Sequence, residues 1–224
     1  MAIKPILFNT EMVRAILDGR KTCTRRIVKG FIPDDAIWGY TVFTPKGYIS
    51  CRGTFPVGYG EKFFKLPYQK GDILYVRETW CRYGKLDDFD HVIEGTEKYY
   101  YLTDGANPTP YNCFLVQRNG YDEYKDTPVW HPSIHMPKEA ARIWLKVKDV
   151  LVERLQGIDG KGCVKEGIEE EPLKDVGEEF VKGMYHDLWD STIKKSDIDR
   201  YGWDANPWVW VIEFERCEKP KKEE

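Results

Sequence analysis

The sequence predicts an α+β fold: a small β-barrel with flanking helices packed at its ends and long inserted loops. Three segments support this prediction, because residues 73–80, 142–155 and 208–214 show the alternation or the branched and aromatic content that is typical of strands. Predicted strands outnumber predicted helices, and the connections between them are irregular, which favours a barrel over a layered arrangement of alternating elements. No internal repeat is present.

The amino-terminal elements follow from capping and periodicity. Residues 3–8 are apolar enough for a short strand. Asn9 or Thr10 can cap a following helix, and Gly19 suits the position just after its end. Residues 22–28 then have the branched side chains of a second strand. The apolar positions on one face of the helix are Val13, Ile16 and Leu17.

The turn pair Gly71-Asp72 leads into the strand at 73–80, whose alternation places Leu74, Val76, Glu78 and Trp80 on one face. Residues 142–155 predict one long strand, and Asp159 can cap a short helix that ends at Gly167. A longer helix is expected over 175–193. The chain then ends in the apolar strand at 208–214.

We expect residues 1–218 to form a single domain with loop insertions at about 29–70 and 82–129, and residues 219–224 to form a flexible tail. Both insertions are rich in turn residues and aromatics and lack a lasting period. The 82–129 insertion is a candidate surface for a protein partner.

Composition limits the classes of function. A net charge of −3 argues against a protein that coats duplex nucleic acid by electrostatics alone, so a nucleic-acid role requires a local basic site. The six cysteines are scattered and include no Cys-x-x-Cys pair, which indicates reduced thiols in a cytoplasmic protein. No run of apolar residues approaches the length of a membrane span or a signal peptide, so we expect no membrane partner.

The most informative segment is Gly19-Arg20-Lys21-Thr22-Cys23-Thr24-Arg25-Arg26, which places four cationic side chains and two threonines within eight residues. This composition suits a surface that binds an anion. Lys beside Thr can also form an activated nucleophile. The same residues therefore predict either a phosphate- or base-binding strand or an acyl-transfer site.

Three motifs together resemble the ASCH family (activating signal cointegrator homology), part of the PUA-like superfamily of RNA-associated β-barrels. They are Leu17-Asp18-Gly19-Arg20-Lys21-Thr22, the Gly71-Asp72-x-Leu74-x-Val76 strand and the final strand at 208–214. Three further segments, 77–80, 132–137 and 206–210, resemble the longer ASCH proteins of phages and prophages. The resemblance covers most of the chain outside about 29–65 and 82–129.

The resemblance implies a barrel with a cleft that holds RNA or a modified nucleoside beside the Gly-x-Lys-Thr segment. One bacterial branch of the family hydrolyses the amide of N4-acetylcytidine with a Lys, a Thr and a Glu. The motif places these roles on Lys21 and Thr24, and on Glu166 as the best match for the acid. In that reaction Lys21 takes the proton of Thr24, Thr24 attacks the acyl carbon, and Glu166 orients or protonates the leaving amine.

Geometry sets a condition on this reaction. Residues three apart in a regular strand lie roughly 10 Å from each other on opposite faces. Lys21 and Thr24 can share a proton only if the chain bends through Gly19–Thr22, where an i,i+3 contact near 5–6 Å becomes attainable. Without the bend, a charged Lys21 would bind phosphate or a base edge and Thr24 would be structural.

The remaining candidates for ligand contact are distributed along the chain. Each also has a structural interpretation: an internal ion pair for Arg77 and Glu78, a rigid proline-bounded loop for Ser133 and His135, and a surface salt bridge for Arg142. Trp80 could stack on a base but is expected in the core. His131 and His135 have metal-like spacing without further ligands, so we predict no metal and no cofactor. The full set of predicted ligand contacts is Arg20, Thr22, Arg25, Arg77, Glu78, Ser133, His135 and Arg142.

Three functions follow from these observations. The first is binding of RNA or a modified nucleoside in the barrel cleft through the basic segment. The second is hydrolysis of an N4-acetylcytidine-type amide by Lys21, Thr24 and Glu166. The third is a phage-encoded protein-interaction module that acts through the 82–129 insertion.

Overall fold

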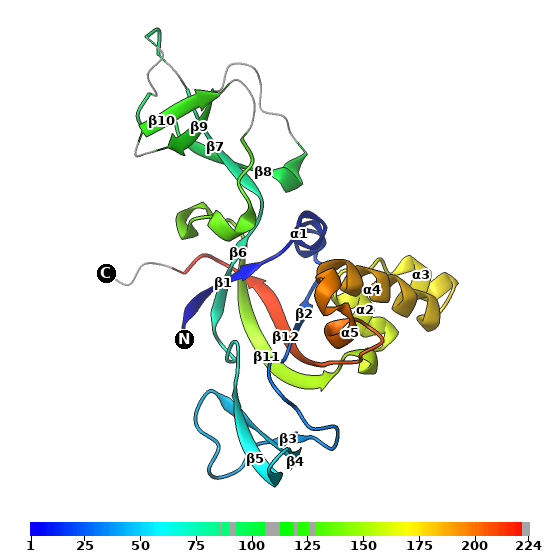
Figure 1. The fold of residues 1–224 in the computed structure, drawn as a ribbon. Coiled ribbons are helices and arrows are strands. Elements are labelled where there is room, and N and C mark those ends of the chain that lie inside the picture. The colour runs from blue at the N-terminus through cyan, green and yellow to red at the C-terminus, as the bar shows by residue number, and fades with distance from the viewer. Residues whose placement is uncertain (86, 90–92, 106–112, 119–120, 126–128, 221–224) are drawn as a thin grey trace.

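The computed structural model describes residues 1–85, 87–89, 93–105, 113–118, 121–125 and 129–220. The last four residues of the predicted tail and parts of the 82–129 insertion lie outside these ranges. The expected mixed α+β class is confirmed: helices and strands both occur, and a five-stranded sheet forms the centre of the molecule (Figure 1). From edge to edge its strands are β1 (Ile3–Leu7), β6 (Ile73–Arg77), β11 (Trp144–Arg154), β12 (Trp208–Cys217) and β2 (Cys23–Ile27).

The central sheet is open rather than closed into a barrel. Strands β1 and β6 are parallel, and the other neighbours are antiparallel. Strands β1 and β2 are the two edges, and no pairing joins them within the described residues. Leu74 and Val76 of β6 are fully buried in the main core, while Ile73 and Tyr75 on the opposite face pack with Met136 and Trp144. Both faces of this strand are therefore covered.

The segment predicted as one strand at 73–80 is two strands. Strand β6 ends at Arg77, and β7 (Trp80–Gly84) begins a different sheet. Trp80 consequently lies against Tyr99 and His131, with ring centroids 5.6 and 4.8 Å away, and not beside Leu74 as the alternation predicts. Glu78, in the link between β6 and β7, is buried like Leu74 and Val76 before it. The alternation of buried residues therefore continues past the end of β6 and does not show where that strand ends.

Two helix termini position the basic segment. Asn9 caps α1 (Thr10–Leu17) by accepting a 2.8 Å hydrogen bond from the Met12 amide, and Gly19 follows with a φ of 81°. Asp159 caps α2 (Gly160–Lys165) by accepting from the Gly162 amide at 2.6 Å. Capping by Asn and Asp satisfies amides that have no partner within the helix, so local sequence suffices to begin both helices.

The remaining helices form a layer on one side of the central sheet (Figure 1): α3 (Glu171–Asp175), α4 (Glu178–Thr192) and α5 (Ile198–Tyr201). Val181, Tyr185 and Trp189 recur every four residues along α4, so they share one face and bury it against Val209 of β12. Phe180, beside Val181 on the same helix, is about half exposed.

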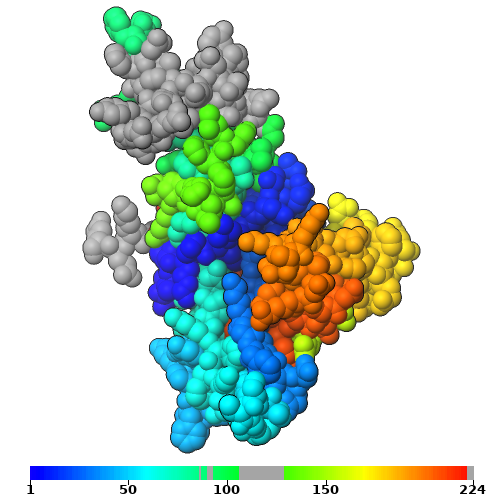
Figure 2. All heavy atoms as spheres, viewed as in Figure 1, coloured from blue at the N-terminus to red at the C-terminus, as the bar shows by residue number. Residues whose placement is uncertain are grey.

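The two insertions contain sheets at opposite ends of the molecule (Figures 1 and 2). Residues 29–70 include a three-stranded antiparallel sheet, where short hairpins within loops were expected. Its strands are β3 (Ile37–Gly39), β4 (Tyr48–Phe55) and β5 (Gly58–Lys65). The second insertion contributes a four-stranded sheet in the order β10-β9-β7-β8. Its added strands are β8 (Lys98–Tyr101), β9 (Cys113–Arg118) and β10 (Tyr121–Lys125).

Candidate functional site

The basic segment enters the protein interior immediately after α1. The Lys21 amide donates to the Ala15 carbonyl at 2.9 Å, and the Thr22 amide donates to the Lys165 carbonyl at 2.8 Å. These two bonds hold residues 19–22 as a bend between α1 and α2, before β2 begins at Cys23. Lys21 therefore lies outside the regular strand, in the connection between α1 and β2.

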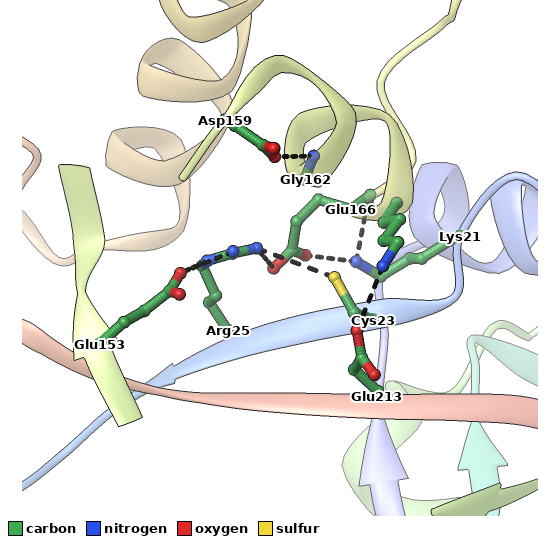
Figure 3. Close-up of polar contacts among 9 residues, drawn as sticks. Lys21, Cys23, Arg25, Glu153, Asp159, Gly162, Glu166 and Glu213 are labelled. Atoms are coloured by element: carbon green, nitrogen blue, oxygen red, sulfur yellow. Dashed lines mark hydrogen bonds and ion pairs between the residues drawn. The ribbon is translucent and has the colours of Figure 1, made fainter. Parts of the chain in front are cut away.

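Lys21 points into the interior toward the end of α2 (Figure 3). Its side chain has no exposed surface, and its Nζ lies 2.6 Å from Glu166 Oε2 and 2.7 Å from the Glu166 carbonyl oxygen. Glu166 is the residue that ends α2, and its side chain is only 3% exposed. Two candidates 145 positions apart are thus joined by a buried ion pair.

Arg25 extends this ion pair into a chain of four charges (Figure 3). Its Nη1 lies 3.2 Å from Glu166 Oε1, and its Nε and Nη2 donate to Glu153 Oε1 at 2.9 and 2.7 Å. Two cations and two carboxylates alternate in the order Lys21, Glu166, Arg25, Glu153, so the formal charge of the group sums to zero. Ion pairs that are removed from water persist only when each charge is compensated in this way.

Thr24 and Glu166 border one narrow cavity. Strand alternation puts Cys23 and Arg25 on one face, where Cys23 Sγ contacts Arg25 Nη1 at 3.7 Å, and Thr24 on the other. The cavity also contacts α4 through Tyr185 and Trp189 and has a volume of about 30 Å³. A space of this size holds about one water molecule, so the cavity must widen before a nucleoside could enter.

The groups around the ion pairs are kept protonated. Burial raises the pKa of the Cys23 thiol to about 12, and the charge of Glu166 adds to the effect. The same two causes raise the pKa of Tyr185 well above its ordinary value. Burial would lower the pKa of Arg25, but the nearby Glu166, with smaller contributions from Tyr185, Cys23 and Glu153, outweighs burial and raises it. The Cys23 thiol and the Tyr185 hydroxyl near the charged Arg25 are therefore neutral.

The other predicted contacts in the basic segment have different environments. Arg20 donates to the Gly167 carbonyl and pairs with Asp18 at 3.1 Å, so it ties the bend to the residue after α2. Thr22 is exposed and borders a separate surface pocket with Lys165. Of the predicted ligand contacts, Arg25 is the one that joins the Lys21 group.

Arg142 and Glu78 form a second charged cluster between the central sheet and the β7–β10 sheet. Glu78 is 1% exposed and accepts from Arg142 Nε at 3.0 Å and from Thr103 Oγ1 at 2.7 Å. Arg142 also contacts Asp104 Oδ1 at 2.8 Å and lies 3.9 Å from the centre of the Tyr101 ring. The structural interpretation from the sequence was an internal ion pair at Arg77 and Glu78 and a surface salt bridge at Arg142, whereas here Arg142 is the partner of the buried Glu78. This second cluster lies on other strands and loops than those that position Lys21, so it is a separate group of charges.

Arg77 donates to the Ile134 carbonyl at 3.0 Å and to Tyr75 Oη at 3.3 Å, so it ties the end of β6 to the proline-bounded loop. That loop contains Ser133 and His135 in one 3₁₀ turn. His135 is exposed and borders a pocket with Trp80.

Sequence reasoning missed two residues of the site. Glu153 lies on β11, and its contact with Arg25 depends on β12 separating β11 from β2 in the sheet, which no local pattern reveals. Tyr185 carried a usable signal, because it lies four residues from both Val181 and Trp189 and therefore on the buried face of α4.

Comparison of the chain with protein-family models, curated proteins and solved structures finds no match. Among the described residues, no group of three or more His, Cys, Asp or Glu side chains is placed to hold a metal ion. The helices of this part of the chain also lack the combination of length and apolar composition that crossing a membrane demands.

Proposed function

We propose that the chain binds a modified nucleoside of the N4-acylcytidine type beside Lys21, Thr24 and Glu166, and hydrolyses its amide. The observation that carries the proposal is the buried 2.6 Å contact between Lys21 Nζ and Glu166 Oε2, with Thr24 on a cavity that Glu166 also borders. The resemblance to the ASCH family supports the same three residues. In this proposal the central sheet corresponds to the PUA-like barrel of that family.

The ion pair can supply both an acid and a base. If one proton crosses from Lys21 Nζ to Glu166, the ammonium and carboxylate become a neutral amine and a neutral carboxylic acid. The exchange leaves the net charge of the pair at zero, so it creates no uncompensated charge in the interior. The amine then takes the proton of Thr24 as its Oγ1 attacks the acyl carbon, and the acid protonates the departing amine of cytidine.

The second half of the reaction restores the site. A water molecule attacks the acyl ester on Thr24 and gives one proton to the Glu166 carboxylate. The Lys21 ammonium returns a proton to Thr24 Oγ1 as the carboxylic acid leaves. The neutral pair can then exchange its proton back to the ion pair, so each residue ends in its starting form.

Binding of a nucleoside or RNA without turnover is the second candidate. It is favoured by the engagement of every buried cation with a carboxylate and by the small cavity, which α4 narrows. A polyanionic RNA is the less suitable ligand for these cations, because Glu153 and Glu166 already neutralise them. A small neutral nucleoside can bind without an unpaired cation in the site.

The test is incubation with N4-acetylcytidine, with products read by liquid chromatography and mass spectrometry. Thr24→Val removes the hydroxyl while keeping the shape of the side chain, and we expect it to lower kcat by about 10³-fold or more. Thr22→Val is the matched control, since Thr22 is an exposed threonine two residues away. Full activity of Thr24→Val would exclude the proposed nucleophile. Binding by calorimetry without any turnover of the unaltered protein would instead establish the second candidate.

A further inference from the structure

A second cavity lies between the β7–β8 strand pair and the loop at 131–139. The residues that border it are distant in sequence from the basic segment. Its volume is about 340 Å³, within the range of about 300–1,000 Å³ that small-molecule sites occupy. The residues that border it include Trp80, Tyr99, His131, His135 and Glu139. None of them takes part in the chemistry proposed for Lys21, Thr24 and Glu166.

The aromatic side of this cavity is held by backbone pairing. Arg82 pairs with Tyr99 across β7 and β8, and Trp80 lies two residues before Arg82, so the three side chains share one face of the strand pair. The Trp80 amide and carbonyl also exchange hydrogen bonds of 3.2 and 2.7 Å with His131. The Trp80 ring lies at 64° to the Tyr99 ring and at 31° to the His131 ring, so a planar ligand that lies parallel to one of Trp80 and Tyr99 meets the other at an angle.

The polar groups of the cavity define what a planar ligand should carry. Burial lowers the pKa of His131, so near neutral pH its ring has one donor and one acceptor nitrogen. The Glu139 carboxylate only accepts, so it suits a ligand with an amino group.

We propose that this cavity binds a nucleobase that bears an exocyclic amine, packed against Trp80 and Tyr99 with its amino group directed to Glu139. Cytosine and adenine have this chemistry, whereas uracil presents a carbonyl oxygen at the corresponding position. The base could belong to a free nucleotide or to a single-stranded RNA. The site does not depend on the reaction proposed at Lys21, and the two can fail independently.

Binding can be measured by calorimetry and by quenching of tryptophan fluorescence with CMP, UMP and a short cytidine-rich oligoribonucleotide. We expect CMP to bind at least about tenfold more tightly than UMP. The amino group of cytosine can donate to the Glu139 carboxylate, whereas uracil would place a carbonyl oxygen there, and two acceptors cannot hydrogen-bond to each other. Tighter binding of the oligoribonucleotide than of CMP would identify a strand as the source of the base. Equal affinities would identify the free nucleotide.

Three variants locate the site. Trp80→Ala should weaken CMP binding about 5- to 150-fold through loss of stacking, and Trp80→Phe, which keeps a ring, should weaken it less. Glu139→Gln should reduce the preference for CMP over UMP. Lys138→Ala is the matched control, because Lys138 is an exposed neighbour in the same turn. Absence of binding by all three probes at millimolar concentration would overturn the proposal, and so would CMP binding that neither Glu139→Gln nor Trp80→Phe alters.

Discussion

Replacement of Lys21 by Met tests whether the buried ion pair is a fixed part of the fold. The change keeps an unbranched side chain of similar length but removes the ammonium that lies 2.6 Å from Glu166. Removing one partner of a buried pair typically costs about 3–5 kcal/mol, because the other charge is left without compensation. Glu166 would keep Arg25 at 3.2 Å, so we expect the lower end of that range, about 3 kcal/mol.

For a chain of 224 residues, 1 kcal/mol corresponds to about 2–4 °C in melting temperature, so Lys21→Met should melt about 6–12 °C lower. Thermal unfolding followed by circular dichroism measures this shift. Lys148→Met is the control, because Lys148 and Glu215 form an exposed pair of the kind that contributes about 0–1 kcal/mol. The double variant Lys21→Met/Glu166→Leu should recover part of the loss, since it leaves no unpaired carboxylate. A Lys21→Met protein that melts within about 2 °C of the unaltered chain would refute this account.

Three further predictions concern packing, the second charged cluster and pH. Gly167→Ala should destabilise the fold by about 1–3 kcal/mol in urea titrations, because Gly167 has a φ of 109° and a Cβ would lie 2.9 Å from that of Ala15; an unchanged unfolding midpoint would contradict this. Glu78→Ala should cost about 2 kcal/mol by the same measurement, since the buried carboxylate holds Arg142, whereas Glu78→Gln should cost less. Cys23 has a folded pKa of about 12 against an ordinary 9, so the unfolded chain releases this proton first and stability should fall as pH rises from about 9 toward 12; Cys23→Ala should show a shallower fall in melting temperature over that window.

Local chemistry predicted the start and end of the elements that surround the site. Asn9 and Asp159 cap their helices by accepting from amides three residues onward, and Gly19 and Gly167 follow those helices with positive φ. These features depend on a few consecutive residues, so the sequence alone contains them. The sequence did not predict that β6 ends before β7 begins. Glu78 lies between the two strands and is buried, so it continues the alternation of β6 although the chain passes there from one sheet to another.

The site itself could be predicted only in part. The resemblance selected Glu166, and the structure places it against Lys21. Glu153 could not be predicted from the sequence. It is 128 positions from Arg25, and the two residues meet only because β11, β12 and β2 are neighbours in that order in the central sheet. The sheet at 37–65 was expected only as short hairpins within loops, because β5 is largely exposed on both faces and its sequence lacks the alternation that identifies a half-buried strand.

Charge balance gives the four-residue group a specific advantage in the proposed reaction. At rest the charges of Lys21, Glu166, Arg25 and Glu153 sum to zero. When Thr24 has attacked and Glu166 still holds its proton, Lys21 and Arg25 carry +2 and Glu153 carries −1, which leaves +1. The tetrahedral intermediate carries one negative charge at that moment, so the site remains neutral as a whole when the oxyanion forms. Charges that are already in place to stabilise an oxyanion in a site without water are a large source of rate enhancement. A neutral acylated nucleoside carries no such charge when it binds, so this stabilisation applies to the transition state and not to the bound substrate.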